Sequence, residues 1–249
     1  MVVLLRASSL VPTGPGGGHF SCGLIDRMAN PAELLHDLFV RWNAPNTAPS
    51  SGRNDPSLVM HRHAVRYLGE IEELLSVAER NGKRVGSYRE YFPLWVRTVF
   101  NFPNSWGTPA SGAISKEQIL HLDNMVDLLN EFVVSPDESK FMDLREYLNL
   151  VGENLAADDS LSPAVRESAG TVITHILGCM DDLTVIGDFE FGKAIERLLG
   201  VLATISLRSS QKDRWRKVLD LFVYPYAVGN LPMLSDGAQF FQLMAGSGQ

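Results

Sequence analysis

Residues 86–108 read GSYREYFPLWVRTVFNFPNSWGT and hold seven of the 22 aromatic residues of the protein in fewer than a tenth of its positions. Aromatic side chains at this density dominate either a hydrophobic core or a binding interface. We expect most of this stretch to be helical and to lie at the centre of a helical bundle. The residues expected in that core are Phe92, Trp95, Val99 and Phe100.

In the alternative interpretation, part of the aromatic set stays exposed on the loop that follows and binds a partner. The candidates are Tyr88, Phe102 and Trp106, which lie beside proline and asparagine as interface aromatics often do. Under this interpretation, Trp106→Ala leaves the melting temperature nearly unchanged and weakens partner binding. Pro93 interrupts the run, so we expect a kink or a helix restart there.

Helix signals recur on both sides of this stretch. Asn30, Pro31 and Glu33 have the pattern of an N-cap, a first-turn proline and a capping-box partner. Other helix starts are expected at Asp55, Ser115, Ser135, Ser162 and Asp188, and a final helix carries Trp215. No sustained alternation of apolar and polar residues is present. The sequence therefore predicts an all-α fold, an antiparallel multi-helix bundle or short helical array of about seven or eight helices.

The chain divides into a turn-rich start and one long helical region. Residues 1–27 include VPTGPGGGH, so we expect a disordered or non-native segment, with Met28 a candidate start of the natural protein. We expect residues 28–249 to form a single all-helical domain. Within it, the polar linker 43–54, NAPNTAPSSGRN, separates the first helix from the main bundle.

Composition excludes several classes of function. The formal net charge of −7 argues against a nucleic-acid surface, and no apolar run is long enough to span a membrane. Cys22 and Cys179 are far apart and have no metal-ligand spacing, which indicates a reducing compartment. We expect an acidic, cytoplasmic protein without a cofactor or a metal.

One local cluster departs from the acidic background. Residues 208–217, RSSQKDRWRK, carry five basic side chains around Trp215. Arg214, Arg216 and Lys217 are therefore candidate partner-binding residues. Basic residues around an aromatic can also bind single-stranded nucleic acid, which the acidic balance of the chain makes the less favoured partner. Residues 127–167 contain ten acidic and three basic residues, and this polarity favours contact with another protein or with a second copy.

The catalytic motifs of hydrolases, kinases and nucleotide-binding proteins are absent, and we expect no catalytic residue. His175 lies in the apolar run 172–177, where a histidine is most often a satisfied core or boundary residue. The alternative is an enzyme or small-ligand binder with a pocket near His175 and the face from Tyr88 to Trp95. Polar side chains that converge in one apolar cavity would favour this alternative.

Four phrases carry a resemblance to a known group of proteins. They are residues 67–75 (YLGEIEELL), 88–96 (YREYFPLWV), 158–163 (DDSLSP) and 187–202 (GDFEFGKAIERLLGVL). Together they make residues 56–207 similar to a group of uncharacterised, all-helical actinobacterial proteins. The resemblance implies an all-helical fold and no activity. From the residues themselves we expect a non-catalytic protein-interaction or regulatory module, of which a mobile-element or defence accessory and an immunity-type binder are examples, with a protein partner or self-association.

Overall fold

The computed structural model describes residues 30–43, 57–100 and 114–226. These ranges form nine α-helices and one short 3-10 helix, and contain no strand. Eight of the α-helices are nine residues or longer, so the prediction of an all-α fold is confirmed. The helices are α1 (Pro31–Trp42), α3 (Val59–Arg80), α4 (Gly86–Phe100), α5 (Lys116–Leu129), α6 (Phe141–Ala156), α7 (Pro163–Asp181), α8 (Leu183–Ile186), α9 (Asp188–Arg208) and α10 (Lys212–Asp220).

Several predictions fall on residues outside these ranges. They are the N-terminal segment 1–27 with Met28, nearly all of the linker 43–54, the helix start at Asp55, the loop residues Phe102 and Trp106, and Cys22.

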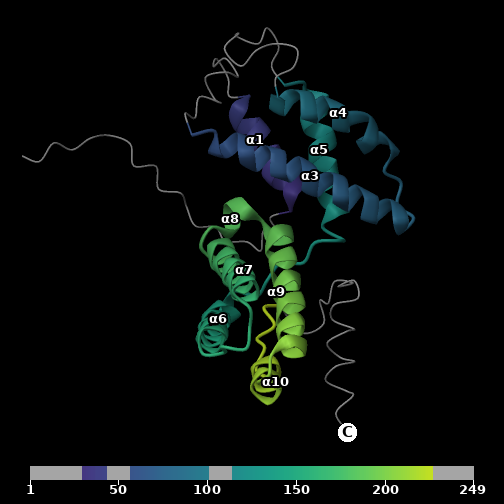
Figure 1. Ribbon diagram of the computed structural model, residues 1–249. Helices are drawn as coiled ribbons and strands as arrows, with labels where there is room; N and C mark the ends of the chain where they lie inside the picture. Colours follow the sequence, from purple (N-terminus) through teal and green to yellow (C-terminus); the bar gives the residue numbers. More distant parts are fainter. Residues whose placement is uncertain (1–29, 44–56, 101–113, 227–249) are drawn as a thin grey trace, which may run out of the picture.

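The first four helices, α1, α3, α4 and α5, pack around one hydrophobic cluster (Figure 1). Asn30 begins α1 as predicted, because its side-chain oxygen accepts hydrogen bonds from the backbone N–H groups of Ala32 and Glu33. The same side chain donates to the Val126 carbonyl at 3.1 Å and so ties α1 to α5. A local cap thus also fixes a tertiary contact.

The aromatic stretch lies in this first cluster. Trp95 and Val99 are fully buried, and Trp95 Nε1 donates to the Gln118 carbonyl at 3.0 Å. Phe92 is half-buried against the cluster, whereas Phe100, also expected in the core, is 50% exposed. Helix α4 continues through Pro93 instead of restarting there.

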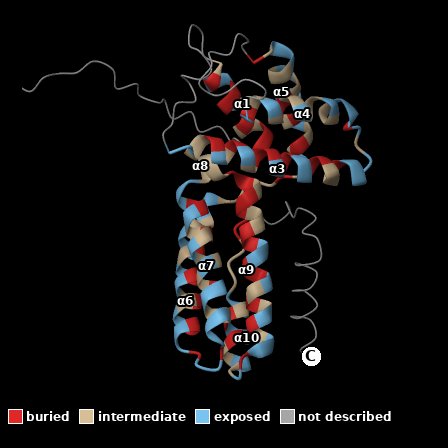
Figure 2. Cartoon of the chain, turned by 45° about the horizontal axis from the view of Figure 1, so that its top comes forward, coloured by how far each residue is buried: buried red, intermediate tan, exposed pale blue. Residues whose placement is uncertain are grey.

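Helices α6, α7, α9 and α10 pack around a second hydrophobic cluster. Helices α7 and α9 run side by side in opposite directions, and the short α8 turns the chain between them (Figures 1 and 2). Gly187 separates α8 from α9 with φ 87°, a conformation that glycine adopts without steric cost. The sequence did not predict α8. The prediction of a single domain over residues 28–249 stays a prediction that unfolding experiments can test.

The predicted start of α6 at Ser135 is wrong. Ser135 donates its hydroxyl to Asp188 at 2.5 Å, a contact that links the start of this segment to α9. Asp137 takes over as the cap of the 3-10 helix Glu138–Lys140, and α6 begins after it at Phe141. Ser135 has the residue type of a helix cap, but its side chain instead bonds to a residue distant in sequence.

Asp158 joins helices at the end of the second cluster that lies near α10. It is completely buried, and its carboxylate accepts hydrogen bonds from the Ser209 hydroxyl at 2.5 Å and from Trp215 Nε1 at 2.7 Å. Ser160 adds its backbone N–H and its hydroxyl. These bonds join the turn before α7 to the start of α10 and hold Trp215 fully buried.

Candidate functional site

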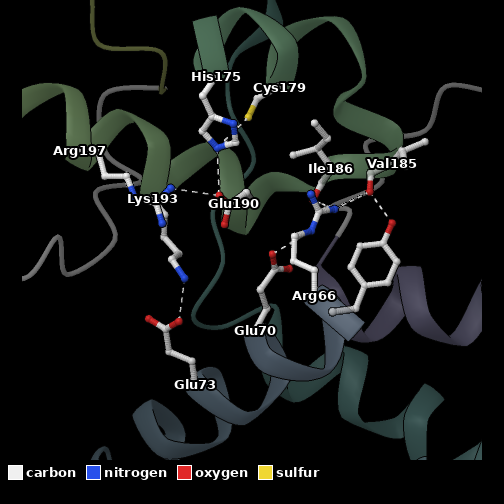
Figure 3. A network of polar contacts seen from close by, with 11 residues as sticks. Arg66, Glu70, Glu73, His175, Cys179, Val185, Ile186, Glu190, Lys193 and Arg197 are labelled. Atoms are coloured by element: carbon white, nitrogen blue, oxygen red, sulfur yellow. Dashed lines mark hydrogen bonds and ion pairs between the residues drawn. The ribbon is translucent and has the colours of Figure 1, made fainter. Parts of the chain in front are cut away.

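The two helix clusters meet where α3 contacts the end of α8. Arg66 Nη2 donates to the carbonyl oxygens of Val185 and Ile186, both at 2.9 Å, and the Tyr67 hydroxyl also donates to Val185 (Figure 3). The last carbonyls of a helix have no partner within the helix, and a cation there is favourable. Burial raises the pKa of Tyr67 to about 12, so its hydroxyl remains a donor at neutral pH.

Glu70 lies one helical turn beyond Arg66 and is only 4% exposed. Its Oε1 is 3.3 Å from Arg66 Nε. Burial raises the pKa of Glu70 to about 8, the positive charge of Arg66 counteracts part of this rise, and the negative charge of Glu190 adds to it. Glu70 is therefore mostly protonated at neutral pH, although an arginine lies beside it.

Glu190 is the centre of the polar contacts on the α9 side. It is 8% exposed, and its Oε1 lies 3.0 Å from His175 Nε2 and 3.3 Å from Arg197 Nη1. On the next turn of α9, Lys193 pairs with Glu73 of α3 at 2.8 Å (Figure 3). Charged side chains of α3, α7 and α9 thus converge at the contact between the two clusters.

Cys179, His175 and Glu190 have the composition of a thiol-based catalytic triad, but their geometry is different. Cys179 Sγ is 3.8 Å from His175 Nε2, the same nitrogen that contacts Glu190. In a triad the acid contacts the other ring nitrogen, so that the first can accept the thiol proton. Cys179 is also fully buried, and burial, reinforced by the charge of Glu190, raises its pKa to about 11. This arrangement connects α7 to α9 and does not activate a nucleophile.

A shallow open groove of about 510 Å³ follows α7 and α9 away from this polar cluster. Helix α7 provides two valines and small residues, and α9 provides a third valine, further small residues and an arginine near each end. The residues are Ser162, Ala164, Val165, Ser168, Val172, Arg197, Gly200, Val201, Thr204 and Arg208. Arg197 belongs to both features, since it lines the groove and pairs with Glu190.

The structure places the residues predicted for a pocket in different clusters. Trp95 is buried in the first cluster, whereas His175 lies on α7 in the second half of the chain. The groove ends close to His175, because Val172, one helical turn before it, lines the groove. Polar side chains gather near His175, while the face from Tyr88 to Trp95 contributes none of the residues that line the groove.

The residues predicted for partner binding do not form one surface. Tyr88 is half-buried on α4, with its hydroxyl donating to the Asn124 carbonyl at 3.3 Å. Arg214 is used within the fold, because it donates to Asn154 and to Gln211. Arg216 and Lys217 are exposed on α10, at the opposite end of the molecule from α4 (Figure 1).

Sequence reasoning missed Glu70, Glu190 and the groove. Glu70 stands next to the buried Ile71 and between apolar positions of α3, which is a signal for a buried acid. The groove has a weaker signal in the sequence, which is the presence of small residues four positions apart on exposed helix faces. These pairs are Ala164 with Ser168 and Gly200 with Thr204. Their meeting depends on how α7 packs against α9.

No protein-family model matches the sequence, and no curated protein or solved structure matches it. Within the described residues, no three or more His, Cys, Asp or Glu side chains are grouped so that they could hold a metal ion. None of the described helices is both long and apolar enough to cross a membrane.

Proposed function

We propose that this protein is a non-catalytic interaction module and that the α7–α9 groove receives a helix of a partner protein. The observation that carries the proposal is the groove itself, with valine walls, small residues and an arginine near each end. We also propose a cytosolic location, which the free and buried Cys179 supports.

The side chains that line the groove suit contact with a helix. Helices pack by placing the side-chain ridges of one into the grooves of another, and small residues allow the closest approach. Ala164 and Ser168 on α7 and Gly200 and Thr204 on α9 are such residues. A partner helix laid between α7 and α9 would contact Val165, Val172 and Val201, which are half-exposed without it.

Gly200 offers a way to block the groove without disturbing the fold. A Cβ atom built on Gly200 has no heavy atom within 4 Å other than those of its two chain neighbours and of the backbone of its own helix, and Gly200 is exposed. A tryptophan at this position would fill the groove, and the replacement does not weaken the helix, because tryptophan has a higher helix propensity than glycine. Gly69 on α3 is also exposed with open space around it, so Gly69→Trp is a matched control away from the groove.

The test is affinity purification from the native source with wild type, Gly200→Trp and Gly69→Trp, followed by mass spectrometry of proteins and small molecules. We expect a stoichiometric protein partner with wild type and Gly69→Trp, and its loss with Gly200→Trp. A partner retained equally by all three proteins would remove the groove from the proposal.

A small-ligand binder near His175 is the second candidate. Its support is the polar cluster of His175, Glu190 and Arg197 beside the groove, whose volume of about 510 Å³ is in the usual range for ligand sites. A metabolite that co-purifies with wild type in place of a protein, and is lost with Gly200→Trp, would favour this candidate.

A further inference from the structure

The groove is lined by positively charged side chains, although the protein as a whole is acidic. The chain has a formal net charge of −7, yet the charged side chains that line the groove among the described residues are both arginines. Of the residues that the structure describes, none that lines the groove carries a carboxylate. An occupant with negative charges near its two ends would therefore meet a complementary potential, and a basic occupant would be repelled.

The two arginines differ in the ion pairs that they already form within the protein. Arg197 is 52% exposed, and one of its nitrogens pairs with Glu190, which also contacts His175. Arg208 is exposed at the other end of the groove and forms no ion pair within the described parts of the chain. Arg208 is thus the more available cation for a ligand.

The distance between Arg197 and Arg208 sets the distance expected between the negative charges of the occupant. Arg197 and Arg208 are eleven residues apart on the same helix, which corresponds to about 16 Å at 1.5 Å per residue. Carboxylates eleven residues apart on a partner helix have the same separation. Between them, an apolar stripe of the partner would face the three valines of the groove.

More apolar surface lies at the end near Arg208. Leu207 is 65% exposed, and it follows Thr204 by three residues, which places both on neighbouring parts of the α9 surface. A large apolar side chain with this exposure, beside a groove and an exposed arginine, resembles the rim of an amphipathic binding site. The surface thus combines apolar contact with positive charge.

We propose that the occupant of the groove is an acidic amphipathic helix of a partner protein, with apolar side chains on Val165, Val172 and Val201 and carboxylates at Arg197 and Arg208. The proposal rests on the proposed function and names the chemistry of the partner. It is a helix-in-groove mode of recognition.

The test uses synthetic peptides of known composition. One is an amphipathic helix of about 18 residues, with leucines along one face and two glutamates eleven positions apart. The matched peptide has glutamine in place of both glutamates. Binding of each labelled peptide to the full-length protein is measured by fluorescence anisotropy at about 50 mM and about 300 mM salt, because ion pairs on a surface weaken as salt rises.

We expect the glutamate peptide to bind about tenfold more tightly than the glutamine peptide at low salt, and the difference to shrink at high salt. Arg208→Glu should abolish this preference, and Gly200→Trp should abolish binding of both peptides. Arg216→Glu is the matched control, since Arg216 is an exposed arginine of α10 that does not line the groove. It should leave both affinities unchanged.

Other outcomes separate this inference from the proposed function. If both peptides bind with equal affinity and Gly200→Trp abolishes both, the proposal that the groove binds a helix stands. The inference that the partner helix is acidic would then be wrong. Binding that persists in Gly200→Trp, or no binding of either peptide, would overturn the inference. A wild-type dimer in sedimentation velocity that Gly200→Trp converts to a monomer would also overturn it, because a second copy would then occupy the groove.

Discussion

Replacing Glu70 by glutamine should change how stability depends on pH. In the folded protein the pKa of Glu70 is raised from 4.5 to about 8, chiefly by burial at the contact between α3 and α9. Between these two values the folded protein holds a proton that the unfolded chain releases. The stabilisation from protonated Glu70 is therefore fully present below about pH 4.5 and is lost as the pH rises through about 8.

The size of the effect follows from the same interval. From 4.5 to about 8, at about 1.4 kcal/mol per pH unit, wild type loses at most about 5 kcal/mol of unfolding free energy to this one group. Glutamine has nearly the same shape and no charge at any pH. Glu70→Gln should thus be close to wild type at about pH 5 and more stable than wild type by several kcal/mol at about pH 9.

The assay is urea unfolding followed by circular dichroism, at intervals between about pH 5 and about pH 9. Glu73→Gln is the control, because Glu73 lies on the same helix but is 51% exposed in its pair with Lys193. Its difference from wild type should vary far less with pH. If Glu70→Gln is instead less stable than wild type at high pH, Glu70 is charged in the folded protein and stabilised by Arg66, and the reasoning fails.

Three further predictions concern the packing of the two clusters. Asp158→Asn should lower the unfolding free energy by on the order of 3 kcal/mol at neutral pH, measured by urea unfolding, since asparagine cannot accept all the hydrogen bonds of a buried carboxylate. Burial alone would raise the pKa of Asp158, but the hydrogen bonds from Ser160, Ser209 and Trp215 hold it at about 2, so wild type should lose its advantage over this variant as the pH falls from about 4 to about 2. Trp95→Ala should cost about 3–5 kcal/mol, because the side chain is fully buried, and a change below about 1 kcal/mol in the same assay would contradict its place in the core. Tyr67→Phe should cost about 1 kcal/mol through the lost hydrogen bond to Val185, and an unchanged denaturation midpoint would show that this bond adds nothing to the contact between α3 and α8.

The fold was predictable where the signals are local. Asn30, Ser115 and Ser162 cap α1, α5 and α7 as predicted, because each side chain bonds to a backbone N–H within three residues. Ser135 was misassigned since its hydroxyl bonds to Asp188, 53 residues away. Helix α8 was missed because four residues are too few to show a helical period.

The candidate site was far less predictable. Its groove needs α7 and α9 at a particular distance and rotation, which no local pattern of either helix determines. Its polar cluster needs Glu70 and Glu190, 120 residues apart, to approach one another across the contact between two hydrophobic clusters. Sequence reasoning identified His175 in this region but placed its pocket together with the face from Tyr88 to Trp95, and Trp95 lies in the other cluster.

The contact between Arg66 and α8 has a consequence for how this protein can vary. Arg66 and Tyr67 bind the carbonyl oxygens of Val185 and Ile186, which belong to the main chain and are present whatever side chains those positions carry. Substitutions at 185 and 186 can therefore accumulate without removing the acceptors, whereas substitutions at 66 and 67 remove the donors. A saturation library scored for folding should show this asymmetry, with 66 and 67 restricted and 185 and 186 permissive.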